Sequence, residues 1–96
     1  MNIRYYKGDD HKISFKFSNL TGEIQDIIFE AKYIDESITI KKKLGDGIDF
    51  ANDWYHIILK PEDTLKIPRY KKMIYDIKII INNLTYTVKR GYMKLL

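Results

Sequence analysis

Apolar and polar residues alternate with a period of two along most of this 96-residue chain. Because successive side chains of an extended strand point to opposite faces, this period predicts half-buried β-strands rather than helices. An early example places Ile13, Phe15 and Phe17 on one face, with polar residues between them. The pattern as a whole predicts about seven strands, near residues 3–6, 12–17, 26–34, 37–44, 54–60, 73–81 and 84–93.

Each predicted strand carries large apolar residues on one of its faces. Side chains that share a face in this way form a core when two layers of strands meet. The predicted inward residues are Ile13, Phe15, Phe17, Ile27, Phe29, Ala31, Tyr33, Ile38, Ile40, Leu44, Tyr55, Ile57, Leu59, Met73, Tyr75, Ile77, Ile79 and Ile81.

Glycine and asparagine separate the strands, since both residues accept the positive φ of tight turns. Asn82–Asn83 lies between two alternating runs and predicts a two-residue hairpin. Thr21–Gly22, Gly45–Gly47 and Asn52–Asp53 mark further turns. Gly91 falls inside the last strand, where a bulge or a close backbone approach is the usual cause. Short strands with turns at intervals of roughly ten residues predict an antiparallel β-sandwich, a single domain over residues 1–96.

One segment interrupts the alternation. Pro61 is followed by two acidic residues, and Pro68 ends the segment. Proline is tolerated in the first helical turn, and acidic side chains complement the positive end of the peptide dipoles. The segment therefore predicts one helical turn from Pro61 to Leu65 that carries the chain between the two sheets.

The composition excludes several classes of function. The net charge is +4, but only three of the 17 basic residues are arginine, the residue best suited to paired contacts with bases and phosphates. This disfavours nucleic acid as a partner, although Lys41–Lys43 and Lys71–Lys72 could form a basic patch. No apolar run approaches the ~18 residues of a membrane helix. The chain has no cysteine, which excludes disulfides and thiolate chemistry.

The acidic residues and histidines form no recognisable catalytic motif. Asp9–Asp10 and Asp35–Glu36 are adjacent pairs, so in a strand their side chains would point to opposite faces. His11 and His56 lack the spacing of a metal pair or a triad. The loop at 45–49, with Asp53 nearby, offers carboxylates for calcium, but we favour a glycine-rich turn. We therefore expect a protein that is not an enzyme and binds no cofactor.

Four aromatic residues, Phe50, Trp54, Tyr70 and Tyr92, fall outside the predicted inward faces. Exposed aromatic rings anchor protein interfaces and also stack on sugars or bases. For a small β-domain we rank a protein partner first, carbohydrate second and nucleic acid third.

Several short motifs occur in order along the chain. A Gly-Asp-Asp turn follows the first strand, a Gly-Ile step precedes a Pro-Glu-Asp-Thr turn, and a Tyr-Asp-Ile strand leads to a last strand with a glycine. This order resembles the N-terminal immunoglobulin-like domain of phage baseplate upper proteins and related small phage tail modules. The chain departs from that pattern at Lys60, where the family usually has Ser or Thr, and at residues 69–72. The matching residues are Gly8, Asp9, Asp10, Gly22, Gly47, Pro61, Glu62, Asp63, Thr64, Tyr75, Asp76 and Gly91.

The resemblance implies an immunoglobulin-like sandwich that is a structural component of a tailed-phage or prophage virion, in its tail, baseplate, neck or head attachment. Such a protein is made in the host bacterial cytoplasm and docks onto other virion proteins in several symmetric copies, without a membrane. The alternative is a carbohydrate- or cell-surface-binding module that uses Trp54 and neighbouring tyrosines. We expect contacts from the opening strand, the terminal strand and the loop at 50–54, with the candidate residues Ile3, Tyr5, Phe50, Trp54, Tyr70, Tyr92, Leu95 and Leu96.

Overall fold

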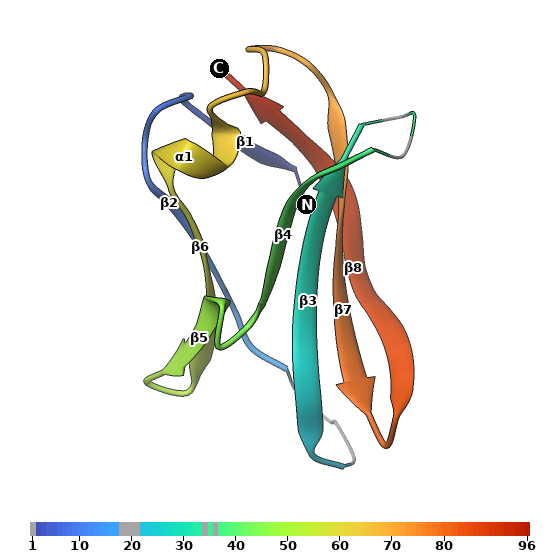
Figure 1. Cartoon of the computed structure of the whole chain (residues 1–96). Helices are drawn as coiled ribbons and strands as arrows, with labels where there is room; N and C mark the ends of the chain where they lie inside the picture. Colours follow the sequence, from blue (N-terminus) through green and yellow to red (C-terminus); the bar gives the residue numbers. More distant parts are fainter. Residues whose placement is uncertain (1, 18–21, 34, 36) are drawn as a thin grey trace.

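The computed structural model describes residues 2–17, 22–33, 35 and 37–96. Predictions that concern Thr21, Ile34, Glu36 and the side chain of Ile38 lie outside the described residues. Within the described part, eight strands form one sheet in the order β1-β8-β7-β3-β4-β5-β6-β2 (Figure 1). The strands are β1 (Ile3–Tyr5), β2 (His11–Phe15), β3 (Ile24–Lys32), β4 (Ile38–Leu44), β5 (Gly47–Ala51), β6 (Trp54–Leu59), β7 (Met73–Ile81) and β8 (Leu84–Leu95).

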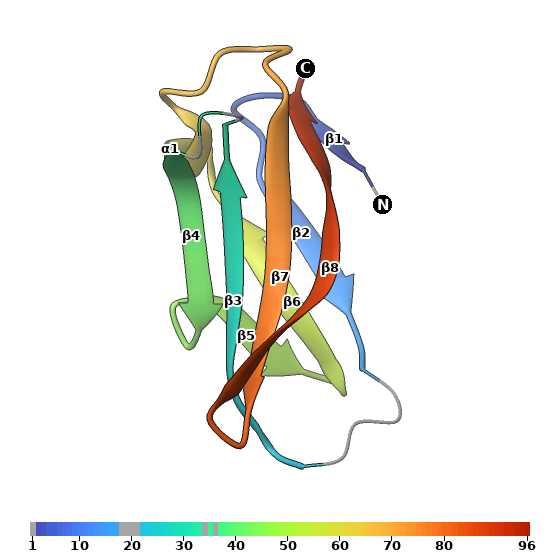
Figure 2. The same ribbon diagram turned by 90° about the vertical axis from the view of Figure 1, so that its right-hand side faces the viewer.

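The sheet curls until its two halves face each other. Strands β3, β7 and β8 lie on one side and β2, β5 and β6 on the other, with β4 between them (Figures 1 and 2). The all-β prediction is confirmed. The eight strands form one continuous, nearly barrel-shaped sheet. Two pairings differ from the expected antiparallel pattern, since β1 pairs with β8 and β4 with β5 in parallel.

The eighth strand, β5, was not expected. Its residues 47–51 lie between two turn signals, Gly45–Gly47 and Asn52–Asp53, and only Ile48 and Phe50 alternate within it. Ile48 is nevertheless buried and pairs with Ile57 of β6. Asn52 and Asp53 both have positive φ and form the turn of a β5–β6 hairpin, so the region expected to be a loop at 50–54 is a hairpin tip.

The predicted inward faces form the core. Phe29 in β3, Ile57 in β6 and Tyr75 in β7 are fully buried. Phe15, Phe17, Tyr33, Leu44 and Tyr55 are partly buried and pack against this core. The alternation did not single out several further core residues, namely Ile3, Tyr5, Ile48, Ile67, Met93 and Leu95.

The β7–β8 hairpin has the predicted turn, but its bulge lies elsewhere than expected. Asn82 and Asn83 both have positive φ, as a type I′ hairpin turn requires. Thr87 pairs with Lys78 and Lys89 pairs with Ile77, so the extra residue between them is Val88. Gly91 instead sits in regular register directly opposite the buried Tyr75.

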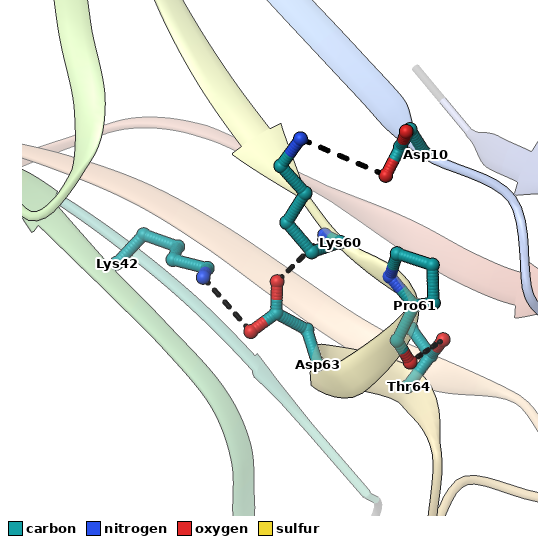
Figure 3. Close-up of polar contacts among 6 residues, drawn as sticks. All are labelled: Asp10, Lys42, Lys60, Pro61, Asp63 and Thr64. Carbon is teal, nitrogen blue, oxygen red and sulfur yellow. Dashed lines mark hydrogen bonds and ion pairs between the residues drawn. The ribbon is translucent and has the colours of Figure 1, made fainter.

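The helical turn α1 (Pro61–Thr64) begins at the predicted proline and ends one residue early. It is stabilised by Asp63, whose carboxylate accepts a 2.7 Å hydrogen bond from the Lys60 backbone N–H (Figure 3). Asp63 therefore caps the turn from within, which explains how Lys60 replaces a hydroxyl residue at this position. The buried Thr64 hydroxyl donates to the Pro61 carbonyl over 3.3 Å. Beyond α1 the chain crosses to β7 on the opposite half of the sheet (Figure 1).

Candidate docking surface

The opening and terminal strands, expected to present side chains to a partner, instead contribute them to the core. Ile3, Tyr5 and Leu95 are buried. Tyr5 and Leu95 are paired in the parallel β1–β8 register, and Leu96 N–H donates to the Tyr5 carbonyl over 2.9 Å. The alternation of β8 turns Leu95 inward, so the C-terminal leucines hold β1 in place. Only Leu96 stays partly exposed.

The four remaining candidates are exposed but lie in two separate groups. Phe50 and Trp54 flank the β5–β6 turn. Tyr70 lies in the segment between α1 and β7, and Tyr92 pairs with Ile74 near the start of β7. These two regions are at opposite ends of the sheet (Figure 1), so the four rings do not form one surface.

Phe50 of the first group lines an aromatic groove of about 650 Å³, which Trp54 does not line. Tyr55 is at its centre, with ring centroids 4.7 Å from Phe50 and 5.7 Å from Phe17. Lys16, Glu23 and Asp53 also line the groove. The Lys16 ammonium lies 5.4 Å from the centroid of the Trp54 ring, so one face of that ring has a cationic neighbour.

Tyr92 of the second group, but not Tyr70, lines a small basic pocket of about 140 Å³. The pocket is lined by Asn2, Ile3, Arg4, Lys72, Tyr92, Met93 and Lys94. The Lys72 ammonium lies 3.9 Å from the Tyr92 ring centroid. Lys71 lies 4.2 Å from the centroid of the Tyr33 ring. The other anticipated basic cluster, Lys41–Lys43, does not form a single patch, because Lys42 turns inward and bonds Asp63 at 2.8 Å (Figure 3).

A third surface, which the sequence did not indicate, is the outer edge of β8. The short strand β1 pairs only with Met93–Leu95. Among the described strands, none pairs with this side of Leu84–Tyr92, which we call the free β8 edge. Its first residues expose three apolar side chains, Leu84 by 57%, Tyr86 by 49% and Val88 by 40%.

The signal for this edge was present in the sequence but was ambiguous. Leu84, Tyr86 and Val88 alternate with Thr85 and Thr87, which is typical of a half-buried strand as well as of an exposed one. Tyr86 and Leu84 pair with the buried Ile79 and Ile81. Directly opposite residues share a face of the sheet, so the two exposed side chains point to the same face as the core.

Ser14 and His56, two polar residues that could support catalysis, are joined by a hydrogen bond between neighbouring strands. The Ser14 hydroxyl lies 2.8 Å from His56 Nδ1. His56 Nε2 donates to the Ala51 carbonyl over 3.3 Å, so Nδ1 is the acceptor for Ser14. Ser14 is exposed on the outer face of the sheet, and we interpret the pair as a link between β2 and β6.

His11 is not close to this pair in register, because it lies opposite Leu59 at the other end of β2. Its ring stacks on Tyr5 with centroids 4.5 Å apart. Burial lowers the pKa of His11. Within the described residues, no three His, Asp or Glu side chains gather where a metal ion could bind. Near the candidate calcium loop, the Gly45 N–H donates instead to the Ile48 carbonyl over 2.8 Å.

Asp76, expected on the polar face of β7, is on that face yet only 2% exposed. The Arg90 guanidinium on the neighbouring strand covers it, with Nε 2.6 Å from a carboxylate oxygen. This hydrogen bond and the carboxylate charge raise the pKa of Arg90. The pair therefore ties β7 to β8 just beyond the bulge.

Comparisons of the chain with family models, with curated proteins and with solved structures returned no match. Over the described residues, no helix is both long and apolar enough to cross a membrane.

Proposed function

We propose that this chain is a structural module of a tailed-phage or prophage virion that docks onto neighbouring virion proteins. The observation that carries the docking part is the free β8 edge. A strand edge offers unpaired N–H and C=O groups to another strand, and natural proteins usually cover or charge such edges. Here the exposed side chains at 84–88 are uncharged, which favours a protein partner on this surface.

The virion part of the proposal rests on the family resemblance. Two of the residues that carry the resemblance lie in turns: Gly8 has positive φ in the turn after β1, and Pro61 opens the helical turn. The curling of the sheet into two facing halves supports an immunoglobulin-like arrangement as part of the same proposal (Figure 2). No catalytic group enters the proposed function.

The direct test is the presence of the chain in particles. Virions released from the strain that encodes it would be purified, and the chain would be quantified by mass spectrometry relative to a major structural protein. We expect a fixed copy number in intact particles. Absence from particles, with the folded chain present in the producing cells, would refute the proposal.

A second candidate function is carbohydrate binding in the aromatic groove. Three rings, those of Phe17, Phe50 and Tyr55, line the groove together with the carboxylates of Glu23 and Asp53. Rings that stack on sugars and carboxylates that accept hydroxyl hydrogen bonds are the groups a glycan site requires. Titration of the intrinsic fluorescence with cell-wall sugars, with Phe50→Ala as the comparison, tests this candidate.

A further inference from the structure

We infer that two copies of this chain associate through the first half of β8, with Leu84–Val88 pairing antiparallel about a twofold axis at Tyr86. The inference deepens the proposed docking function, because it names a second copy as the partner of the free β8 edge. It also specifies which residues of the two strands lie opposite each other.

The hairpin turn determines which backbone groups of β8 are available. In a two-residue hairpin the residues that flank the turn, here Ile81 and Leu84, exchange two hydrogen bonds. Hydrogen-bonded pairs then recur at every second position of an antiparallel ladder. Leu84 and Tyr86 therefore direct their N–H and C=O groups toward β7. Those of Thr85 and Thr87 point to the free edge, where a second strand can bind them.

An axis at Tyr86 uses these groups fully. It places Thr85 of each copy opposite Thr87 of the other, as a hydrogen-bonded pair on both sides of the axis. The two Tyr86 residues then form the closely spaced pair without backbone bonds. Leu84 of each copy lies opposite Val88 of the other. Aromatic pairs and threonine pairs are among the cross-strand combinations that stabilise antiparallel sheets.

The charge distribution favours a second copy as the occupant in this register. The chain carries +4, so two copies require a contact without facing lysines or arginines. Residues 84–88 are uncharged. Lys89 and Arg90 fall outside the paired segment, opposite the asparagines of the other copy's turn. The Arg90 charge is in addition paired with Asp76.

The register centred on Thr87 is less favourable. An axis at Thr87 would set Leu84 against Arg90 and Thr85 against Lys89 of the second copy. That arrangement removes the tyrosine pair and faces an apolar side chain with a cation. The bulge at Val88 also ends the regular part of the strand. Tyr86 is therefore the centre of the uncharged segment Leu84–Val88 of the free β8 edge.

The association can be tested by cross-linking, because the chain has no cysteine of its own. The Tyr86→Cys variant carries a single thiol. The proposed axis brings its two copies to a Cα separation of about 4.5 Å, within the range of a disulfide. We expect mild oxidation to produce a covalent dimer. The matched control Thr85→Cys should remain uncrosslinked, because Thr85 faces Thr87 in this register and two copies of residue 85 are too far apart.

Two results of the cross-linking experiment would overturn the inference. One is the absence of a dimer with Tyr86→Cys, and the other is equal dimer yields with Tyr86→Cys and Thr85→Cys, which indicates random collision. Circular dichroism of both variants verifies that they fold. A chain that is monomeric at every concentration in analytical ultracentrifugation, or that binds only a strand of another protein, also overturns it.

The unmodified chain provides the second measurement. We expect its sedimentation to show a reversible dimer. Tyr86→Lys should abolish the dimer, and Tyr92→Lys, an exposed change on the same strand outside the paired segment, should preserve it. A chain that dimerises but is absent from particles would refute only the proposed function. A chain that is monomeric but present in particles would refute only this inference.

Discussion

Replacement of Tyr5 by phenylalanine tests whether the buried hydroxyl of this residue weakens the fold. Tyr5 is 7% exposed, and its ring stacks on His11. Its hydroxyl has no hydrogen-bond partner among the described residues. Burial, together with the negative charge of Asp63, raises the pKa of Tyr5 from 10.0 to about 12, and the neighbouring Thr64 side chain partly opposes this rise. The hydroxyl is therefore both unsatisfied and resistant to ionisation in the folded state.

The sign and size of the effect follow from these values. In the unfolded chain Tyr5 loses its proton near pH 10, whereas the folded chain retains it until about pH 12. Stability is therefore unaffected below pH 10 and falls as the pH rises through this window. The loss of stability is at most about 3 kcal/mol, and solvent screening reduces it to roughly 1–2 kcal/mol. At neutral pH, removal of an unsatisfied buried hydroxyl should stabilise the protein by about 1 kcal/mol.

Urea unfolding of Tyr5→Phe and of the unmodified chain, at neutral and at alkaline pH, measures both effects. We expect the variant to have the higher midpoint at neutral pH and a smaller loss of stability above pH 10. The variant should still lose some stability above pH 10, because burial also raises the pKa of Tyr75. The exposed Tyr70→Phe should behave like the unmodified chain. A Tyr5→Phe variant that is less stable at neutral pH and declines equally with pH would show that the hydroxyl is bonded in the folded protein.

Three further substitutions test the packing and the polar contacts by urea unfolding. Gly47→Ala should cost more stability than Gly45→Ala. Both residues have positive φ, a strain of about 1–2 kcal/mol for alanine, but only a Cβ at Gly47 would collide with the Lys42 side chain. Equal losses of stability in the two variants would contradict this contact. Asp63→Asn should cost about 1–2 kcal/mol of stability because it weakens the bond to Lys42. Asp10→Asn removes an exposed pair with Lys60 at 3.8 Å and should change stability by less than about 0.5 kcal/mol. A larger loss with Asp10→Asn than with Asp63→Asn would contradict this order. Phe29→Ala, at a fully buried position, should cost about 3–5 kcal/mol, and a loss below about 1 kcal/mol would mean that the core is not packed as described.

The alternation of apolar and polar residues was sufficient to predict most of the strands. Alternation depends only on the geometry of the extended chain, so it identified the inward faces of β3, β6 and β7, including Phe29, Ile57 and Tyr75, which are all fully buried. The turn at Asn82–Asn83 and the helical turn at Pro61 were also predictable, because each depends on the backbone preferences of a few adjacent residues.

The features that were not predictable depend on contacts between distant segments. Strand β5 is short, and its burial comes from pairing with β6 and β4 rather than from its own pattern. The parallel pairing of β1 with the end of β8 buries Tyr5 and Leu95, and no local signal distinguishes these residues from a partner-binding end. The bulge at Val88 depends on the register between two strands. Gly91, for which a bulge was one of two possible explanations, therefore did not mark its position.

The residues that carry the family resemblance and the residues that carry the docking surface are different sets. Gly8 makes a turn, Asp63 caps α1 and bonds Lys42, and Tyr75 fills the core. Each of these roles concerns the folding of the chain, so the resemblance bears on fold more directly than on partner. The free β8 edge has the opposite character: Leu84 and Tyr86 are exposed beside the buried Ile81 and Ile79, and an apolar side chain at such a position gains stability only when another strand covers it. Substitutions at this edge therefore test docking, whereas substitutions at the family motifs test the stability of the fold.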